Sequence, residues 1–306
     1  MAIIGRELEL EKRNFLHKKV DIPELVIKFH KERRNYVKNN EIEYVKIRQV
    51  LFNEQAYKSK ISLDTSKKIA HDFYYFINSS FGKKYELILN GENGLTVDIG
   101  IDKFGRNVSE SNLYIPFDLD ESCYCHYLLS VKNYNSIKTV YSLVHEVMHT
   151  MMLIDKKYKK SSFILLETPS YLVESLLGDF IINNYKKYNL NDLDIIYDVC
   201  IWNINRFYNY INNINNSVIP DYFIALLIRS KFDLFSLDIK KEKLVEFVSY
   251  LKTDKLENAI KIIELNLDCN EIENRNLYIN YMIQNFISFS QTLLEINKKT
   301  KIKKIN

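Results

Sequence analysis

Two histidines and a glutamate lie together in the sequence His145-Glu146-Val147-Met148-His149. The histidines are four residues apart, so on a helix both imidazoles project from one face, one turn apart, as two ligands of a tetrahedral Zn²⁺ require. Glu146 can take a proton from a water whose pKa the metal has lowered to about 7. The pattern is therefore typical of zinc sites at which a glutamate is the general base for peptide hydrolysis.

Two acidic residues further along the chain compete for the position of a third ligand, Asp155 and Glu167. Asp155 would complete the set only if the chain turned at a glycine after the second histidine, but Met152 occupies that place. On a continuous helix, Asp155 would lie about 240° round the axis from His149 and would point away from the metal. Glu167 is therefore the expected ligand, and two histidines with one glutamate leave an open position, as catalytic zinc sites do.

The apolar segment Phe163–Leu177 carries a second acid, Glu174, seven residues after Glu167. An unpaired buried carboxylate costs several kcal/mol, so each acid needs a partner. If the segment is one helix kinked near Pro169, both acids share a face, and Glu174 can orient a ligand histidine from behind. Alternatively, Thr168 caps a new helix with Pro169 at its first position, which leaves Glu167 just outside it.

These residues resemble the M3 family of zinc peptidases, the thimet oligopeptidase and oligoendopeptidase F group, in a compact and divergent form. The family signature is a His-Glu-x-Gly-His helix and a Glu-x-x-Ser-x-x-x-Glu helix, and this chain has His145–His149 followed by Glu167-x-Pro169-Ser170-x-x-x-Glu174. The resemblance implies Zn²⁺ as cofactor, Glu146 as general base, and Glu174 with Ser170 behind the ligands. The implied zinc ligands are His145, His149 and Glu167.

The chain also departs from the family pattern. Met148 stands at the family's glycine, and no histidine follows His149, whereas the family has a late segment rich in His and Tyr that binds substrate and stabilises the oxyanion. The expected counterpart is Ile219–Arg229, in which Tyr222 and Arg229 share a helical face and either could donate to a developing oxyanion. Two later tyrosines are rival donors: Tyr278 and Tyr281.

Several elements must position this site. Ser136 is the expected N-cap of the His-Glu-x-x-His helix, which should end near Ile154. Earlier helices are expected between Leu8 and Asn78, including a start at Pro23 and a helix over Ser66–Ile77, in which His71 is read as a surface or core histidine. A helical region follows from Leu190 to Leu294, with expected loops at Asn212–Val218, Leu237–Lys240 and Asn266–Asn274.

Five of the seven glycines fall between Gly82 and Gly105, which indicates turns between short strands. The expected strands are Glu86–Leu89, Leu95–Ile101 and Asn112–Phe117. This sheet would either hold an extended substrate along an exposed edge or only support the zinc helix.

Composition limits the possible partners. The net charge is +4, from 43 basic and 39 acidic residues, which gives no case for nucleic acid. No run of about 18 apolar residues is present, so no membrane association is expected. The charged N-terminus does not resemble a secretory signal, so a cytoplasmic location is expected. Export as an effector by a route that needs no signal is the open alternative. The expected partner is a peptide or protein substrate.

The cysteines do not form a pattern typical of disulfides or of a closed zinc site, although Cys123-x-Cys125 lies beside His126. All four are expected to be reduced and mostly packed: Cys123, Cys125, Cys200 and Cys269.

The predicted fold is mainly α with a small β-sheet, a zincin-like metallopeptidase core with helical lobes flanking a cleft. We expect a single peptidase domain over 1–306, with an N-terminal helical lobe (1–80), a sheet with the zinc-site helices (85–190) and a C-terminal helical lobe (191–306). The predicted function is zinc-dependent hydrolysis of a peptide bond. The alternative is a catalytically impaired, peptidase-like binding protein that retains zinc.

Overall fold

The computed structural model describes residues 57–91, 95–99, 111–115, 126–154, 163–212, 219–252 and 261–263, together with 285, 288, 289, 291, 292, 295 and 296. Most of these residues are helical, as predicted. Several predictions concern residues outside this set: the helices before residue 57, the loops at 213–218 and 266–274, and Asp155, Cys123, Cys125, Cys269, Tyr278 and Tyr281.

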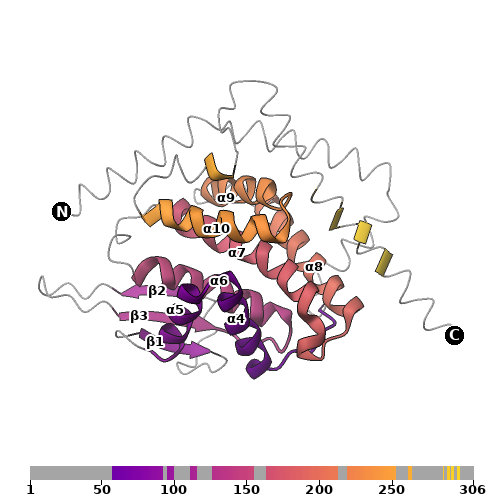
Figure 1. Ribbon diagram of the computed structural model, residues 1–306, viewed down its shortest axis with the longest axis horizontal. Helices are drawn as coiled ribbons and strands as arrows, with labels where there is room; N and C mark the ends of the chain where they lie inside the picture. Colours follow the sequence, from indigo (N-terminus) through magenta and orange to yellow (C-terminus); the bar gives the residue numbers. More distant parts are fainter. Residues whose placement is uncertain are drawn as a thin grey trace, which may run out of the picture.

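The helices of the described part come before and after the three strands in the chain order (Figure 1). They are α4 (Leu63–Ile77), α5 (Ser79–Leu89), α6 (Ile137–Ile154), α7 (Phe163–Asn184), the 3-10 helix η3 (Tyr185–Tyr188), α8 (Asp192–Asn212), α9 (Ile219–Phe232) and α10 (Leu237–Lys252). The predicted helix over Ser66–Ile77 is confirmed as most of α4.

A three-stranded sheet lies beside α6, with the order β1-β3-β2. Strand β3 (His126–Val131) runs parallel to β1 (Leu95–Ile99) and antiparallel to β2 (Ser111–Ile115). Strands β1 and β2 lie at the chain positions of the predicted strands Leu95–Ile101 and Asn112–Phe117. Strand β3 was not predicted.

The predicted strand at Glu86–Leu89 is wrong, because these residues form the last turn of α5. The side chain of Asn78 caps the helix by accepting a hydrogen bond from the N–H of Phe81 at 2.9 Å. Phe81, Tyr85 and Ile88 are buried at a helical spacing, so a strand here would expose part of this apolar set.

The His-Glu-x-x-His helix has the predicted limits. The hydroxyl of Ser136 accepts a hydrogen bond from the N–H of Lys138 at 3.3 Å, and α6 continues to Ile154. The described side chains of α6 from Thr139 to Met152 are all buried, because α4, α7 and the sheet surround the helix. The hydroxyl of Tyr74, on α4, donates to the carbonyl of Val144 at 2.7 Å.

Helix α7 runs without interruption through Pro169, so the first of the two alternatives for this segment, a single helix, is confirmed. It packs against α6 on one side and against α9 and α10 on the other (Figure 1). Because Glu167, Ser170 and Glu174 are three and then four residues apart, they lie on the face of α7 that meets α6.

The predicted loop at Leu237–Lys240 is also wrong, because these residues begin α10. The connection from α9 is shorter than expected: the turn lies at Asp233–Ser236, and the carbonyl of Ser236 already accepts the N–H of Lys240 at 2.8 Å. One hydrophobic cluster extends from Ile61 through α6 and α7 to Ile263. Among the described helices, none has both the length and the apolar composition needed to cross a lipid bilayer.

Candidate metal centre

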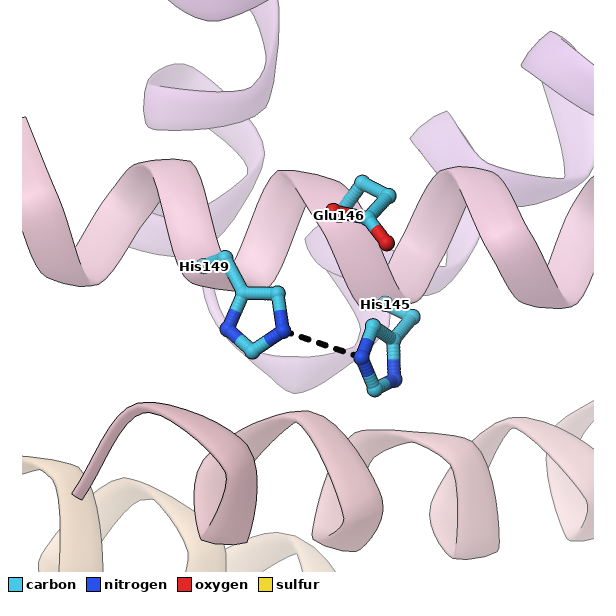
Figure 2. A group of neighbouring side chains, drawn as sticks. All are labelled: His145, Glu146 and His149. Carbon is cyan, nitrogen blue, oxygen red and sulfur yellow. Dashed lines mark hydrogen bonds between the residues drawn. The ribbon is translucent and has the colours of Figure 1, made fainter. Parts of the chain in front are cut away.

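The imidazoles of His145 and His149 project from one face of α6 towards α7 (Figure 2). Their Nε2 atoms are 2.9 Å apart. Glu146 follows the first histidine on the same helix, and the three side chains place potential ligand atoms within 4.8 Å of one another. All three residues are buried, with exposed fractions of 6% for His145, 8% for Glu146 and 8% for His149.

Glu167 brings a carboxylate from α7 to the two histidines. Its Oε2 lies 3.5 Å from Nε2 of His145, and its Oε1 lies 3.4 Å from Nε2 of His149. Oε2 is buried and makes no hydrogen bond with any residue that the structure describes. Two imidazole nitrogens and one carboxylate therefore converge on one point between α6 and α7.

The outer nitrogen of each ring is engaged elsewhere. Nδ1 of His145 lies 2.7 Å from Oε1 of Glu174, and Nδ1 of His149 lies 3.1 Å from Oγ of Ser170. The Ser170 hydroxyl donates its proton to the carbonyl of His145 at 3.3 Å, so it accepts from Nδ1–H of His149. In neutral rings both Nε2 atoms are then unprotonated, and their lone pairs face each other and the carboxylate.

Such an arrangement of lone pairs requires a cation. In the protein without metal, that cation is a proton. Burial lowers the pKa of His145, but Glu167 and Glu174 outweigh this effect and raise the pKa to about 10. Burial raises the pKa of Glu167, but His149 and His145 outweigh it and hold the pKa well below its usual range. A divalent metal would replace the proton, and two imidazoles with one carboxylate form the donor set of catalytic zinc sites.

Glu174 is buried completely and is surrounded by donors. Its Oε2 accepts from Nε1 of Trp202 at 3.0 Å, from Nε of Arg206 at 3.1 Å and from Nη1 of Arg229 at 3.1 Å. Its Oε1 accepts from Nη2 of Arg206 at 2.5 Å as well as from His145. Burial raises the pKa of Glu174, but Arg206, His145 and Arg229 outweigh it and lower the pKa to about 2.

The structure brings together most of the residues selected from the sequence: His145, Glu146, His149, Glu167, Ser170 and Glu174. Tyr222 lies within α9, but its side chain is outside the described set. His71 is part-exposed on α4, where its ring contacts Asp72 and Glu86.

Arg229 was expected as a donor to the developing oxyanion, but the structure places it against Glu174. This side chain is fully buried, and its guanidinium contacts Glu174, Asn203 and Asp233. The reason is electrostatic, since the buried Glu174 carboxylate needs compensating positive charge.

Sequence reasoning missed Trp202 and Arg206 as partners of Glu174. They are four residues apart on α8, so they share a face. The available signal was the need of a buried acid for donors, but the chain offers many cationic residues, and no local pattern singles out one of them.

Comparisons of this chain with protein-family models, with curated proteins and with solved structures found no match. The resemblance to M3 peptidases therefore remains a prediction that rests on the two motifs, and the chemistry has to be inferred from the site.

Proposed function

We propose that this protein is a zinc-dependent peptidase, with His145, His149 and Glu167 as the metal ligands. The observation that carries the proposal is the convergence of two Nε2 atoms, 2.9 Å apart, on a carboxylate with an unbonded buried oxygen. In the metal-free protein a proton on His145 compensates these lone pairs, and Zn²⁺ would replace that proton. Three protein ligands leave a position for water or substrate, which is the arrangement of catalytic zinc sites.

The residues of the chain have separate roles in this proposal. Zn²⁺, when bound, would polarise a peptide carbonyl and make a water more acidic. Glu146 would accept the proton of the attacking water and donate it to the leaving amine, because it lies beside the ligands on a buried helix. Ser170 and Glu174 would hold the two imidazoles in the tautomer that presents Nε2. Tyr222 remains the proposed donor to the oxyanion.

The surroundings of the centre suit a zincin-like core. The sheet lies beside the helix that carries both histidines, through contacts of β3 and β2 with α6. We propose that an extended peptide substrate pairs with an edge of this sheet and reaches the metal centre from there.

A second candidate function is a binding protein that keeps zinc but does not hydrolyse peptides. The observation in its favour is that Arg229 is buried against Glu174, so one of the two expected donors to the oxyanion does not serve the reaction. The intact set of ligands together with Glu146 favours the peptidase, since a purely structural zinc site has no need of a base.

The test of the peptidase is the substitution Glu146→Gln. We expect Zn²⁺ to bind stoichiometrically to both proteins, because Glu146 is not a proposed ligand, and cleavage of a peptide library to fall by about 10²–10⁴-fold in the variant. Zinc content is measured by atomic emission on the same samples.

Glu86→Gln, on the exposed surface of α5, is the matched control and should cleave like the unsubstituted protein. Cleavage by Glu146→Gln at the normal rate would reject Glu146 as the base. Stoichiometric zinc without cleavage of any library peptide by the unsubstituted protein would favour the binding protein.

A further inference from the structure

Arg206 holds both oxygens of Glu174. Its Nη2 lies 2.5 Å from Oε1 and its Nε lies 3.1 Å from Oε2. The guanidinium is also held over two aromatic rings, with its carbon 4.6 Å from the ring centre of Trp202 and 5.4 Å from that of Tyr171. A planar fork on a carboxylate, fixed by stacking, leaves the carboxylate little freedom to rotate.

Two further donors, on α8 and α9, contact the same carboxylate. Nε1 of Trp202 and Nη1 of Arg229 both donate to Oε2. Arg206 contacts Oε2 as well as Oε1, and Oε1 is the oxygen that lies next to Nδ1 of His145.

We propose that Arg206 is a positioning residue of the metal centre. Its two N–H groups set the plane of the Glu174 carboxylate, Oε1 then holds Nδ1–H of His145, and the ring presents Nε2 to the metal beside Glu167. The proposal rests on the metal-binding part of the proposed function and is independent of peptide cleavage.

The planar pair of donors of Arg206 and its positive charge can be tested separately, because substitutions can remove one without the other. Arg229 already places a second guanidinium on Glu174, so positive charge near the carboxylate does not depend on Arg206 alone. Lysine keeps the charge of arginine but lacks the planar pair of donors that can contact two oxygens at once. Arg206→Met removes both the charge and the fork, whereas Arg206→Lys removes only the fork.

The test measures the affinity for Zn²⁺ by competition with a chromophoric chelator, and the visible absorption spectrum of the protein loaded with Co²⁺. We expect Arg206→Met to bind Zn²⁺ about 10-fold more weakly, the lower end of the usual effect of losing an outer-shell partner, because Arg206 acts on the ligand through Glu174. Arg206→Lys should recover less than half of that loss on a logarithmic scale. The Co²⁺ bands should change in both variants, because His145 is no longer held in one orientation.

Lys187→Met is the matched control, since Lys187 is a half-exposed cation paired with the carboxylate of Asp72 at 2.8 Å, outside the metal centre. It should leave both readouts unchanged. Circular dichroism and thermal unfolding of the metal-free proteins establish whether each variant is folded. If Arg206→Met does not fold, the test rests on Arg206→Lys.

Normal Zn²⁺ affinity and an unchanged Co²⁺ spectrum in a folded Arg206 variant would overturn the proposal while leaving the peptidase intact. Full recovery by Arg206→Lys would also overturn it, because charge alone would then suffice. Weaker binding in the variants of a protein that cleaves no peptide would support the proposal and reject the peptidase. Failure of the unsubstituted protein to bind Zn²⁺ would reject both.

Discussion

His145 has three polar neighbours that act on its two nitrogens. Nδ1 lies 2.7 Å from Glu174, and Nε2 faces both His149 and Glu167. Two carboxylates around one buried imidazole favour the protonated ring, which is why the pKa rises in spite of burial. The same nitrogen that would hold the metal therefore holds a proton in the metal-free protein.

The first prediction concerns this proton. Because the pKa of His145 is raised to about 10 without metal, the ring is protonated at pH 7.5 and must lose its proton when Zn²⁺ binds. We expect release of about one proton per Zn²⁺, and an apparent affinity that rises roughly tenfold per pH unit from pH 7 towards pH 9. Isothermal titration calorimetry in buffers of different ionisation enthalpy measures the number released.

The control is His149→Ala, which removes a proposed ligand and should lose most of the zinc-dependent heat. An enthalpy of binding that is the same in every buffer would contradict the raised pKa of His145.

At the scale of elements, the close approach of α6, α7 and α8 depends on one glycine of α7. A Cβ atom at Gly178 would lie 2.9 Å from the hydroxyl oxygen of Tyr141 on α6 and 3.2 Å from Cγ1 of Val199 on α8. The ring of Tyr141 is itself stacked on Trp202, with centroids 4.6 Å apart. These three helices carry the proposed metal ligands, Glu174, and the partners Trp202 and Arg206. At Gly178 they are packed so closely that there is no room for a methyl group.

The second prediction is that Gly178→Ala destabilises the protein. Overpacking typically costs about 1–3 kcal/mol, which exceeds the gain of up to about 1 kcal/mol from replacing glycine by alanine in a helix. We expect a net loss in the free energy of unfolding of about 1 kcal/mol, measured by urea denaturation of the metal-free protein.

Tyr141→Phe provides the control, since the Tyr141 hydroxyl makes no hydrogen bond among the described residues and its removal should cost little. In the double variant Gly178→Ala/Tyr141→Phe, part of the lost stability should return, because the closest contact is gone. Equal destabilisation by Gly178→Ala with and without the hydroxyl would show that this contact does not limit the packing.

At the scale of the whole molecule, Asp198 joins parts of the chain that are far apart in sequence. Its Oδ1 accepts the N–H of Lys58 and its Oδ2 accepts the N–H of Ser59, both at 2.8 Å. The N–H of Ile61 in turn donates to the carbonyl of Asn135, just before α6. Residues 57–61 therefore link α8, which supports Glu174, to the start of the helix that carries both histidines.

The third prediction concerns how the protonation of the Asp198 carboxyl in this link changes the stability of the protein. Burial raises the pKa of Asp198 to about 6, although the two N–H groups oppose the rise, whereas the carboxyl of an unfolded aspartate has a pKa of about 4. The folded protein thus binds this proton more tightly than the unfolded chain. Its contribution to stability is complete below pH 4, declines as the pH rises from about 4 to about 6, and is constant above that range.

Urea denaturation at a series of pH values measures this contribution as a difference between the unsubstituted protein and Asp198→Asn, which cannot titrate. The difference should change between pH 4 and pH 6 in the direction given above. Asp64→Asn, at an exposed position of α4, is the control and should not remove that pH dependence. A profile for Asp198→Asn parallel to that of the unsubstituted protein would contradict the prediction.

The sequence by itself determined the parts of this protein that depend on local spacing. Two histidines four apart on an apolar segment already imply one helical face, and Glu167 and Glu174, seven apart, imply another. The cap at Ser136 and the positions of β1 and β2 also follow from residues next to one another in the chain. For these features, neighbouring residues supply the pattern, and at the Ser136 cap they also supply the hydrogen-bonding partner.

Only the tertiary structure decided which distant side chains meet. Arg229 could serve a substrate or a buried acid as far as its sequence neighbours show, and its placement on Glu174 follows from the packing of α9 against α7. Arg206 reaches the same carboxylate from α8, and β3 exists because two other strands provide its partners. The physical reason is that compensation of buried charge and pairing of strands act between surfaces, whose contacts are set by the fold and not by spacing along the chain.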